Sequence, residues 1–215
     1  MHVLFDLDGT LTDSAAGITR CIAHALERLG RVPPPAAALR PCIGAPLAEA
    51  FRALLGGADD SLVRHAVALY RERFASVGMY ENEVCAGIPE LLATLRERGL
   101  PLRVVTSKPT VYSVEIVRHF GLADFFEGVH GSELDGTRTD KTELVAHVLE
   151  IEKIAPHEAI MIGDRSHDVR GALANDVRPI GVLWGYGSRE ELAAAGAAAI
   201  VARPADLPVA LGADG

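Results

Sequence analysis

Short apolar runs alternate with amphipathic segments along most of the chain. The runs at residues 3–7, 102–106, 159–163 and 179–183 have the length and the continuous apolar character of strands that are buried on both faces. Apolar positions at helical spacing lie around and between the later runs, at Leu91, Leu92 and Leu95, at Val114, Val117 and Phe120, and at Leu144, Val145, Val148 and Leu149. This alternation predicts an α/β fold: a doubly wound, mostly parallel sheet with helices on both faces.

The interval after the first predicted strand breaks this rhythm. Residues 15–86 contain no convincing strand but three helical stripes, at 18–29, 47–55 and 62–73, separated by proline and glycine. We therefore predict a small helical domain at 15–86, inserted into a core formed by 1–14 and 87–215. Ligands of open α/β sheets bind beyond the carboxyl ends of the strands, so we expect the insertion to roof the site.

Composition and charge exclude several classes of protein. The formal charge of −8, from 21 basic and 29 acidic residues without a long run of either sign, argues against electrostatic binding of a nucleic-acid polymer. The three cysteines have no spacing typical of a zinc site and are an odd number for a disulfide framework. The chain begins with few apolar residues before an acid and has no run long enough to span a membrane, so we expect a cytoplasmic protein.

Two acids end the first predicted strand. Asp6 and Asp8 are one residue apart, so their side chains can point to the same side of the chain. Burying two carboxylates together is costly unless a cation or a shared proton relieves the repulsion, and hard oxygen ligands suit Mg²⁺. The alternative is an ordinary Asp-Gly turn with solvated acids.

Polar residues also follow two later strands. Thr106, Ser107 and Lys108 follow one of them, where a hydroxyl and backbone N–H groups at a helix start form an anion site. Asp164 follows the next strand, and Asp168 lies one helical turn further on. Each group alone fits an ordinary helix cap or a solvated first turn. Their coincidence at three strand ends favours a functional site.

These motifs, in this order, resemble the phosphatases of the haloacid dehalogenase superfamily. The matching residues are DLDGT at 6–10, Thr106 in VVTS, Lys141, and GDRSHD at 163–168. The resemblance spans essentially the full length and implies a Rossmann-like core, with residues 15–86 as a helical cap domain. TSKP at 106–109 and IGAPLAEAF at 43–51 are most similar to phosphoglycolate phosphatases and to related 5'-nucleotidase-like proteins.

A second LDGT, at 134–137, is interpreted as a loop. It has Glu133 at the position of the nucleophile and follows the glycine-punctuated EGVHGS, whereas the first LDGT follows an apolar strand. We expect this loop to lead into Lys141 at the start of a helix. Taken alone, Lys141 would be interpreted as a surface lysine.

The resemblance implies a covalent route through an aspartyl-phosphate. Asp6 would attack phosphorus, and Asp8 would protonate the leaving oxygen and then activate water. The Asp6 carboxylate, the Asp8 backbone carbonyl and Asp164 would hold Mg²⁺. Asp168 would orient water molecules or a neighbouring lysine.

The resemblance also implies a cradle for the transferred phosphoryl group. Thr106, the Ser107 N–H and Lys141 would hold its oxygens. Lys108 is a candidate for binding a second anionic group, such as the carboxylate of phosphoglycolate, and Arg40 is another; the alternative for both is a solvated surface side chain.

Two further groups of residues are assigned no chemistry. His167, within the fourth motif, is interpreted as a surface or supporting residue. The aromatic residues Phe5, Tyr70, Phe74 and Trp184 are interpreted as core.

The leading hypothesis is an Mg²⁺-dependent phosphomonoesterase, monomeric or homodimeric, acting on a small phosphate ester, with phosphoglycolate first and nucleoside monophosphates second. A phosphomutase resembling the β-phosphoglucomutases would use the same residues. A dehalogenase is a weaker hypothesis because it would not need Asp8 or Asp164. A receiver-like module that keeps a regulatory phospho-aspartate and an inactive scaffold are the alternatives outside enzymology.

Overall fold

The structure is a computed structural model, and it describes residues 1–212 of the protein. It divides into two compact units, Met1–Asp13 with Val84–Gly215 and Ser14–Glu83. The last three residues of the core predicted at 87–215 lie outside the described part of the chain. Across residues 1–212, no helix combines the length and the apolar character needed to cross a membrane.

The first unit is built on a six-stranded sheet in the order β5-β4-β1-β6-β7-β8, and each pair of neighbouring strands is parallel. The strands are β1 (His2–Phe5), β4 (Leu102–Pro109), β5 (Gly128–Ser132), β6 (Ala159–Gly163), β7 (Arg178–Val182) and β8 (Ala199–Val201). This order confirms the predicted doubly wound α/β fold. It also brings the carboxyl ends of β4, β1 and β6 side by side.

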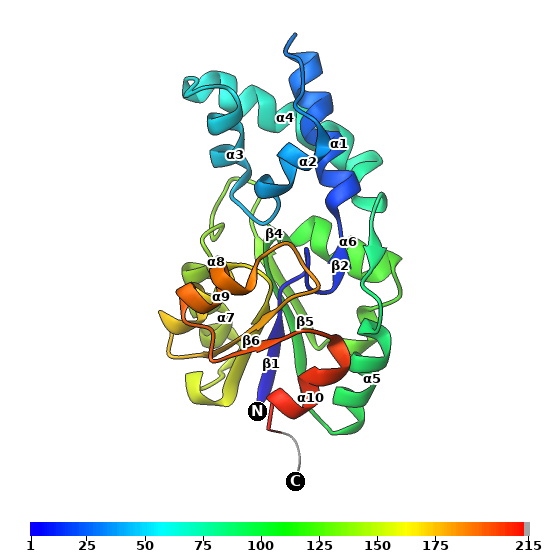
Figure 1. Ribbon diagram of the computed structural model, residues 1–215, viewed down its shortest axis with the longest axis vertical. Coiled ribbons are helices and arrows are strands. Elements are labelled where there is room, and N and C mark those ends of the chain that lie inside the picture. The colour runs from blue at the N-terminus through cyan, green and yellow to red at the C-terminus, as the bar shows by residue number, and fades with distance from the viewer. Residues whose placement is uncertain (213–215) are drawn as a thin grey trace. The chain divides into compact units, whose positions relative to one another are not determined.

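Helices cover both faces of this sheet (Figure 1). They are α5 (Ile88–Glu97), α6 (Thr110–His119), α7 (Lys141–Glu152), α8 (Ser166–Leu173), α9 (Arg189–Ala195) and α10 (Leu207–Ala210), with 3-10 turns at Ala123–Phe125, Pro156–Glu158 and Pro204–Asp206. Figure 1 shows α7 and α8 on the face opposite α5 and α10. Under α7, Leu144, Val145 and Val148 pack in one buried cluster with Leu4 and Val105 of the sheet. Burial of this apolar surface holds the central strands in place.

The second unit is mainly helical. It contains α1 (Ala15–Arg28), α2 (Ala36–Leu39), α3 (Leu47–Leu54) and α4 (Asp60–Ser76), with 3-10 turns at Arg40–Cys42 and Gly78–Tyr80. Phe51 and Phe74 pack on either side of Tyr70, in edge-to-face and stacked geometry respectively. A short two-stranded sheet of β2 (Thr12–Asp13) and β3 (Glu83–Val84) joins the segments through which the chain leaves and re-enters the first unit. The prediction that 15–86 lacks strands is therefore wrong at β3. The role of this unit as a cap stays a prediction.

The sequence analysis missed both edge strands of the large sheet. The residues of β5, GVHGS, include two glycines, and β8 is only three residues long within an alanine-rich stretch. An edge strand has a neighbouring strand on one side only and is less completely buried than a central strand. It therefore lacks the continuous apolar run that marks a central strand.

The buried face of α6 also differs from the prediction. Ser113, Ile116 and Val117 face the core, whereas Val114 is 47% exposed. Ser113 can be buried because its hydroxyl donates a hydrogen bond to the Pro109 carbonyl oxygen at 3.1 Å.

Strand β4 continues past its predicted end at Thr106, with a register shift against β5 between Thr106 and Pro109. The Ser132 hydroxyl of β5 donates to the Ser107 carbonyl oxygen at 2.8 Å. Gly131 lies so close to this irregular segment that a methyl group on it would overlap with the Lys108 carbonyl oxygen. Bulges of this kind redirect side chains at the end of a strand, and here they set the direction of residues 106–108.

We predict that Gly131→Ala destabilises the protein by about 1–3 kcal/mol, the usual cost of inserting a methyl group where backbone atoms cannot retreat. Urea denaturation followed by circular dichroism measures the change. Val111→Ala, on the exposed face of α6, is the control and should shift stability by less than about 0.5 kcal/mol. Equal stability of Gly131→Ala and the wild type would show that the close approach is not a constraint.

Candidate functional site

A buried lysine joins the carboxyl ends of the central strands. Lys141 donates hydrogen bonds to Asp6 Oδ1 at 2.8 Å and to the Val105 carbonyl oxygen at 3.0 Å, and its Nζ lies 2.8 Å from Asp168 Oδ1. Its side chain is only 4% exposed, so Lys141 is not a surface lysine. One ammonium group therefore links β1, β4 and α8, which lie far apart in the sequence.

The loop at 133–140 delivers this lysine to the site. It contains the second LDGT, which is a loop as predicted. Asp140 then caps α7: its side chain accepts hydrogen bonds from the backbone N–H groups of Thr142 and Glu143. The cap fixes the first turn of α7, and Lys141 is the first residue of that turn.

Asp164 and Asp168 come from the segment between β6 and α8. Asp164 Oδ1 accepts a hydrogen bond from the Thr10 hydroxyl at 3.3 Å, and its Oδ2 accepts one from the Tyr186 backbone N–H at 2.7 Å. Asp168, in the first turn of α8, accepts one from the Arg165 backbone N–H at 3.1 Å. Both carboxylates are buried, and both are held by donors near them in the fold.

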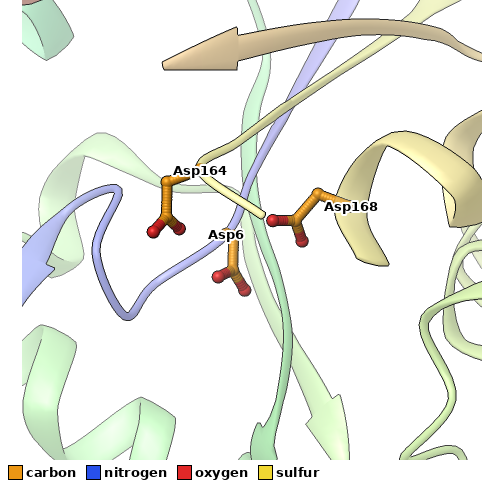
Figure 2. A group of neighbouring side chains, drawn as sticks. All are labelled: Asp6, Asp164 and Asp168. Atoms are coloured by element: carbon orange, nitrogen blue, oxygen red, sulfur yellow. The ribbon is translucent and has the colours of Figure 1, made fainter. Parts of the chain in front are cut away.

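The carboxyl groups of Asp6, Asp164 and Asp168 face a common space (Figure 2). Each of the three offers an oxygen, and these oxygens lie within 4.8 Å of one another. Burial and the nearby carboxylate of Asp168 raise the pKa of Asp6 to about 6, although Lys141 opposes the rise. Burial and the nearby carboxylates of Asp168 and Asp6 raise the pKa of Asp164 well above its usual range.

This donor set fits a hard divalent cation. Three buried carboxylates with one lysine leave an excess of negative charge that a cation would offset. Oxygen ligands of this type are the ones that Mg²⁺ prefers. From the sequence we expect Asp6 and Asp164 in the ligand set and Asp168 beside a lysine, and all three lie close together. These roles stay predictions.

Asp8 is paired with Lys108. The Lys108 ammonium donates a hydrogen bond to Asp8 Oδ1 at 2.8 Å, and both side chains are less than 10% exposed. Two buried and opposite charges at this distance stabilise each other strongly compared with an exposed pair. Lys108, which we expected to meet a distal anion of the substrate, thus contacts Asp8 instead.

The remaining predicted residues fall into two groups. Thr106 is 2% exposed, and its hydroxyl accepts a hydrogen bond from the Lys108 N–H at 3.3 Å; Ser107 follows it at the same sheet edge. Arg40 lies in the second unit and is exposed, and His167 is exposed on α8. The substrate-binding roles of Ser107, Lys108 and Arg40 stay predictions.

The structure adds residues that the sequence analysis did not assign to the site. The Thr10 hydroxyl and the Tyr186 N–H both contact Asp164. Trp184 was interpreted as core, but it is half-buried and its indole N–H donates to the Thr10 carbonyl oxygen at 2.9 Å. The one available sequence signal was the run WGYG at 184–187, a glycine-rich stretch that follows a buried strand.

Comparison with known proteins identifies the family of this chain. Residues 3–182 match the haloacid dehalogenase-like hydrolase family. A 5'-nucleotidase of Pseudomonas aeruginosa is 51% identical over 193 residues, which cover 90% of this chain and 87% of that protein. Phosphoglycolate phosphatases of other bacteria are 28–29% identical.

Two further relatives bear on the chemistry. The tyrosine-protein kinase PtkA of Mycobacterium tuberculosis is 41% identical over 86% of this chain, which spans only 62% of the length of that kinase. The crystal structure of a predicted phosphatase from Clostridium acetobutylicum superposes with a TM-score of 0.95 at 42% identity, covering 99% of this chain and 98% of that one. The chain therefore belongs to the haloacid dehalogenase-like hydrolases, and it is a phosphatase of that family.

Proposed function

We propose that the protein is an Mg²⁺-dependent phosphomonoesterase that works through an aspartyl-phosphate on Asp6. The observation that carries this proposal is the arrangement around Asp6: a buried carboxylate at a strand end, 2.8 Å from a buried lysine and close to two further acids. A nucleophile that must meet a dianionic phosphate ester needs positive charge beside it. Lys141 supplies part of that charge.

Lys141 keeps its own proton in this environment. Burial alone would lower the pKa of Lys141, but the carboxylates of Asp168 and Asp6 outweigh burial and raise it. The ammonium therefore stays charged at neutral pH. It orients Asp6 for in-line attack, and it also lies where developing charge on the phosphoryl oxygens can be stabilised.

Asp8 provides the proton transfers in this proposal. It follows the nucleophile by two residues and lies in a buried position, where it can protonate the leaving oxygen and then take a proton from water. Thr106 and the backbone N–H of Ser107 hold the phosphoryl oxygens during both displacements. The carboxylates of Asp6 and Asp164 and the Asp8 backbone carbonyl hold Mg²⁺. When bound, the ion offsets the repulsion between these acids and the phosphate.

Two classes of substrate merit first attention. TSKP at 106–109 is similar to both phosphoglycolate phosphatases and 5'-nucleotidase-like proteins, and the relative at 51% identity is named a 5'-nucleotidase. The latter similarity makes nucleoside 5'-monophosphates the first substrates to test. A relative named as a tyrosine-protein kinase is 41% identical, so the acceptor of the phosphoryl group also needs a test. We propose that water is the acceptor, since Asp8 is present to activate it.

We predict that the purified protein with Mg²⁺ releases phosphate from a nucleoside monophosphate or from phosphoglycolate. Asp6→Asn should lower kcat by more than about 10³-fold, because the amide cannot form the acyl phosphate. Phosphate release is measured across a panel with sugar phosphates and p-nitrophenyl phosphate. A parallel reaction with ATP and a tyrosine peptide tests the other acceptor. Turnover of Asp6→Asn near the wild-type rate would exclude Asp6 as the nucleophile.

Lys108→Met separates the two roles of Lys108. If the ion pair with Asp8 matters for protonation of the leaving group, kcat/KM, which reports phosphoryl transfer to Asp6, should fall about 10²-fold for phosphoglycolate and for an alkyl phosphate without a second charged group. It should fall little for p-nitrophenyl phosphate, whose leaving group needs no acid. If Lys108 binds a distal anion instead, kcat/KM should fall for phosphoglycolate alone, through a higher KM. We expect the first pattern, and steady-state kinetics on the three esters distinguishes them.

The raised pKa of Asp6 predicts a pH-dependent stability of the metal-free protein. Folding raises this pKa from 3.8 to about 6, so the native state binds a proton more tightly than the unfolded chain does. This contribution to stability is present below pH 4 and is lost as the pH rises through 6. Urea denaturation without metal should therefore show a steeper fall between pH 4 and 6 in the wild type than in Asp6→Asn. Parallel curves would contradict the shift.

A further inference from the structure

The segment from Trp184 to Glu191, hereafter the 184–191 segment, connects β7 to the first turn of α9. The backbone N–H of Tyr186 donates a hydrogen bond of 2.7 Å to Asp164 Oδ2. The Thr10 hydroxyl lies 3.3 Å from Asp164 Oδ1. Asp164 therefore has one donor on each carboxylate oxygen, which fixes the plane of the group.

The 184–191 segment can approach Asp164 this closely because it carries glycine at two positions. A methyl group on Gly185 would overlap with the Asp164 side chain and with the Gly9 carbonyl oxygen. A methyl group on Gly187 would overlap with the Asp164 carbonyl oxygen. The segment is thus packed on Asp164 along its backbone rather than through flexible side chains.

Two aromatic side chains tie the same segment to the residues that follow the nucleophile. The Trp184 indole N–H donates to the Thr10 carbonyl oxygen at 2.9 Å. The Tyr186 hydroxyl donates to Asp13 Oδ1 at 2.8 Å. Because Asp6 precedes this stretch by only a few residues, the orientation of Asp164 is linked to the position of the strand end that carries the nucleophile.

The far end of the segment holds the start of α8. Glu191 Oε1 accepts hydrogen bonds from Arg165 Nε at 3.0 Å and from the Ser166 backbone N–H at 2.8 Å. Both residues lie between Asp164 and Asp168, so the 184–191 segment contacts this acid-bearing stretch at its beginning and at its middle. The neighbouring Glu190 is exposed and makes neither contact.

We propose that the 184–191 segment positions the metal-binding acids, with Trp184, Tyr186 and Glu191 as its positioning residues. The inference rests on the proposed function, because it assigns the segment to the Mg²⁺ site. Mutually repelling carboxylates relax apart unless fixed donors hold them, and such outer contacts typically change metal affinity by about 10–100-fold. The segment supplies those donors from outside the recognised motifs.

Isothermal titration with MgCl₂ alone tests this role without any substrate. We expect the double variant Trp184→Phe/Tyr186→Phe, which keeps an aromatic ring at each position but loses both side-chain hydrogen bonds, to bind Mg²⁺ about 10-fold more weakly than the wild type. Glu191→Ala should show a similar loss. Glu190→Ala removes the same charge from the same helical turn and should stay within about twofold. Asp164→Asn serves as a reference for the loss of Mg²⁺ affinity when a metal ligand itself is removed.

Thermal unfolding of each metal-free variant provides the second readout. A merely structural role would lower the melting temperature but leave the Mg²⁺ affinity of the folded protein unchanged, which would overturn the inference. Tyr186→Phe alone is the milder variant if the double variant does not fold, and it should also bind Mg²⁺ more weakly. Absence of Mg²⁺ binding by the wild type would overturn the proposed metal site itself, and the inference with it. If the wild type binds Mg²⁺ and the variants bind it equally tightly, the role of the 184–191 segment is overturned but the proposed metal site is not.

Discussion

The ammonium group of Lys141 is the contact on which the rest of the site depends. It lies within 2.8 Å of both Asp6 and Asp168 and is almost fully buried. Removing it would leave the carboxylates of Asp6 and Asp168 buried without this neighbouring positive charge, a far more costly state than an exposed acid. The cap at Asp140, the loop at 133–140 and the packing of α7 all serve to bring this one charge to the end of β1.

Much of the fold and of the site could be predicted because the central strands and the acids leave strong local signals. A strand buried on both faces must be continuously apolar, which marked β1, β4, β6 and β7 to within a few residues. Paired acids directly after such strands are rare without a function, which marked Asp6, Asp8 and Asp164. Lys141 was predicted only through the resemblance, since a single lysine in the first turn of a helix has no distinctive sequence pattern.

The features that could not be predicted from the sequence involve main-chain hydrogen bonds, the irregularity in β4 and the edge strands of the large sheet. The donor of Tyr186 to Asp164 is a main-chain N–H, which any residue except proline possesses. Lys108 pairs with Asp8 because the register shift in β4 turns it that way, and a bulge leaves no hydrophobic pattern. The edge strands β5 and β8 were missed for a similar reason. Their sequences are short and rich in small residues, and they pair with the sheet without forming a continuous apolar run.

The contacts of the 184–191 segment also bear on the order in which the site can form during synthesis. Asp6 precedes the Tyr186 N–H that orients Asp164, and the carboxylate of Glu191, by about 180 residues. Asp6 is therefore synthesised well before the groups that hold Asp164 and the start of α8. The contacts that orient Asp164 and hold the start of α8 can form only once β7 and the first turn of α9 have joined the sheet domain.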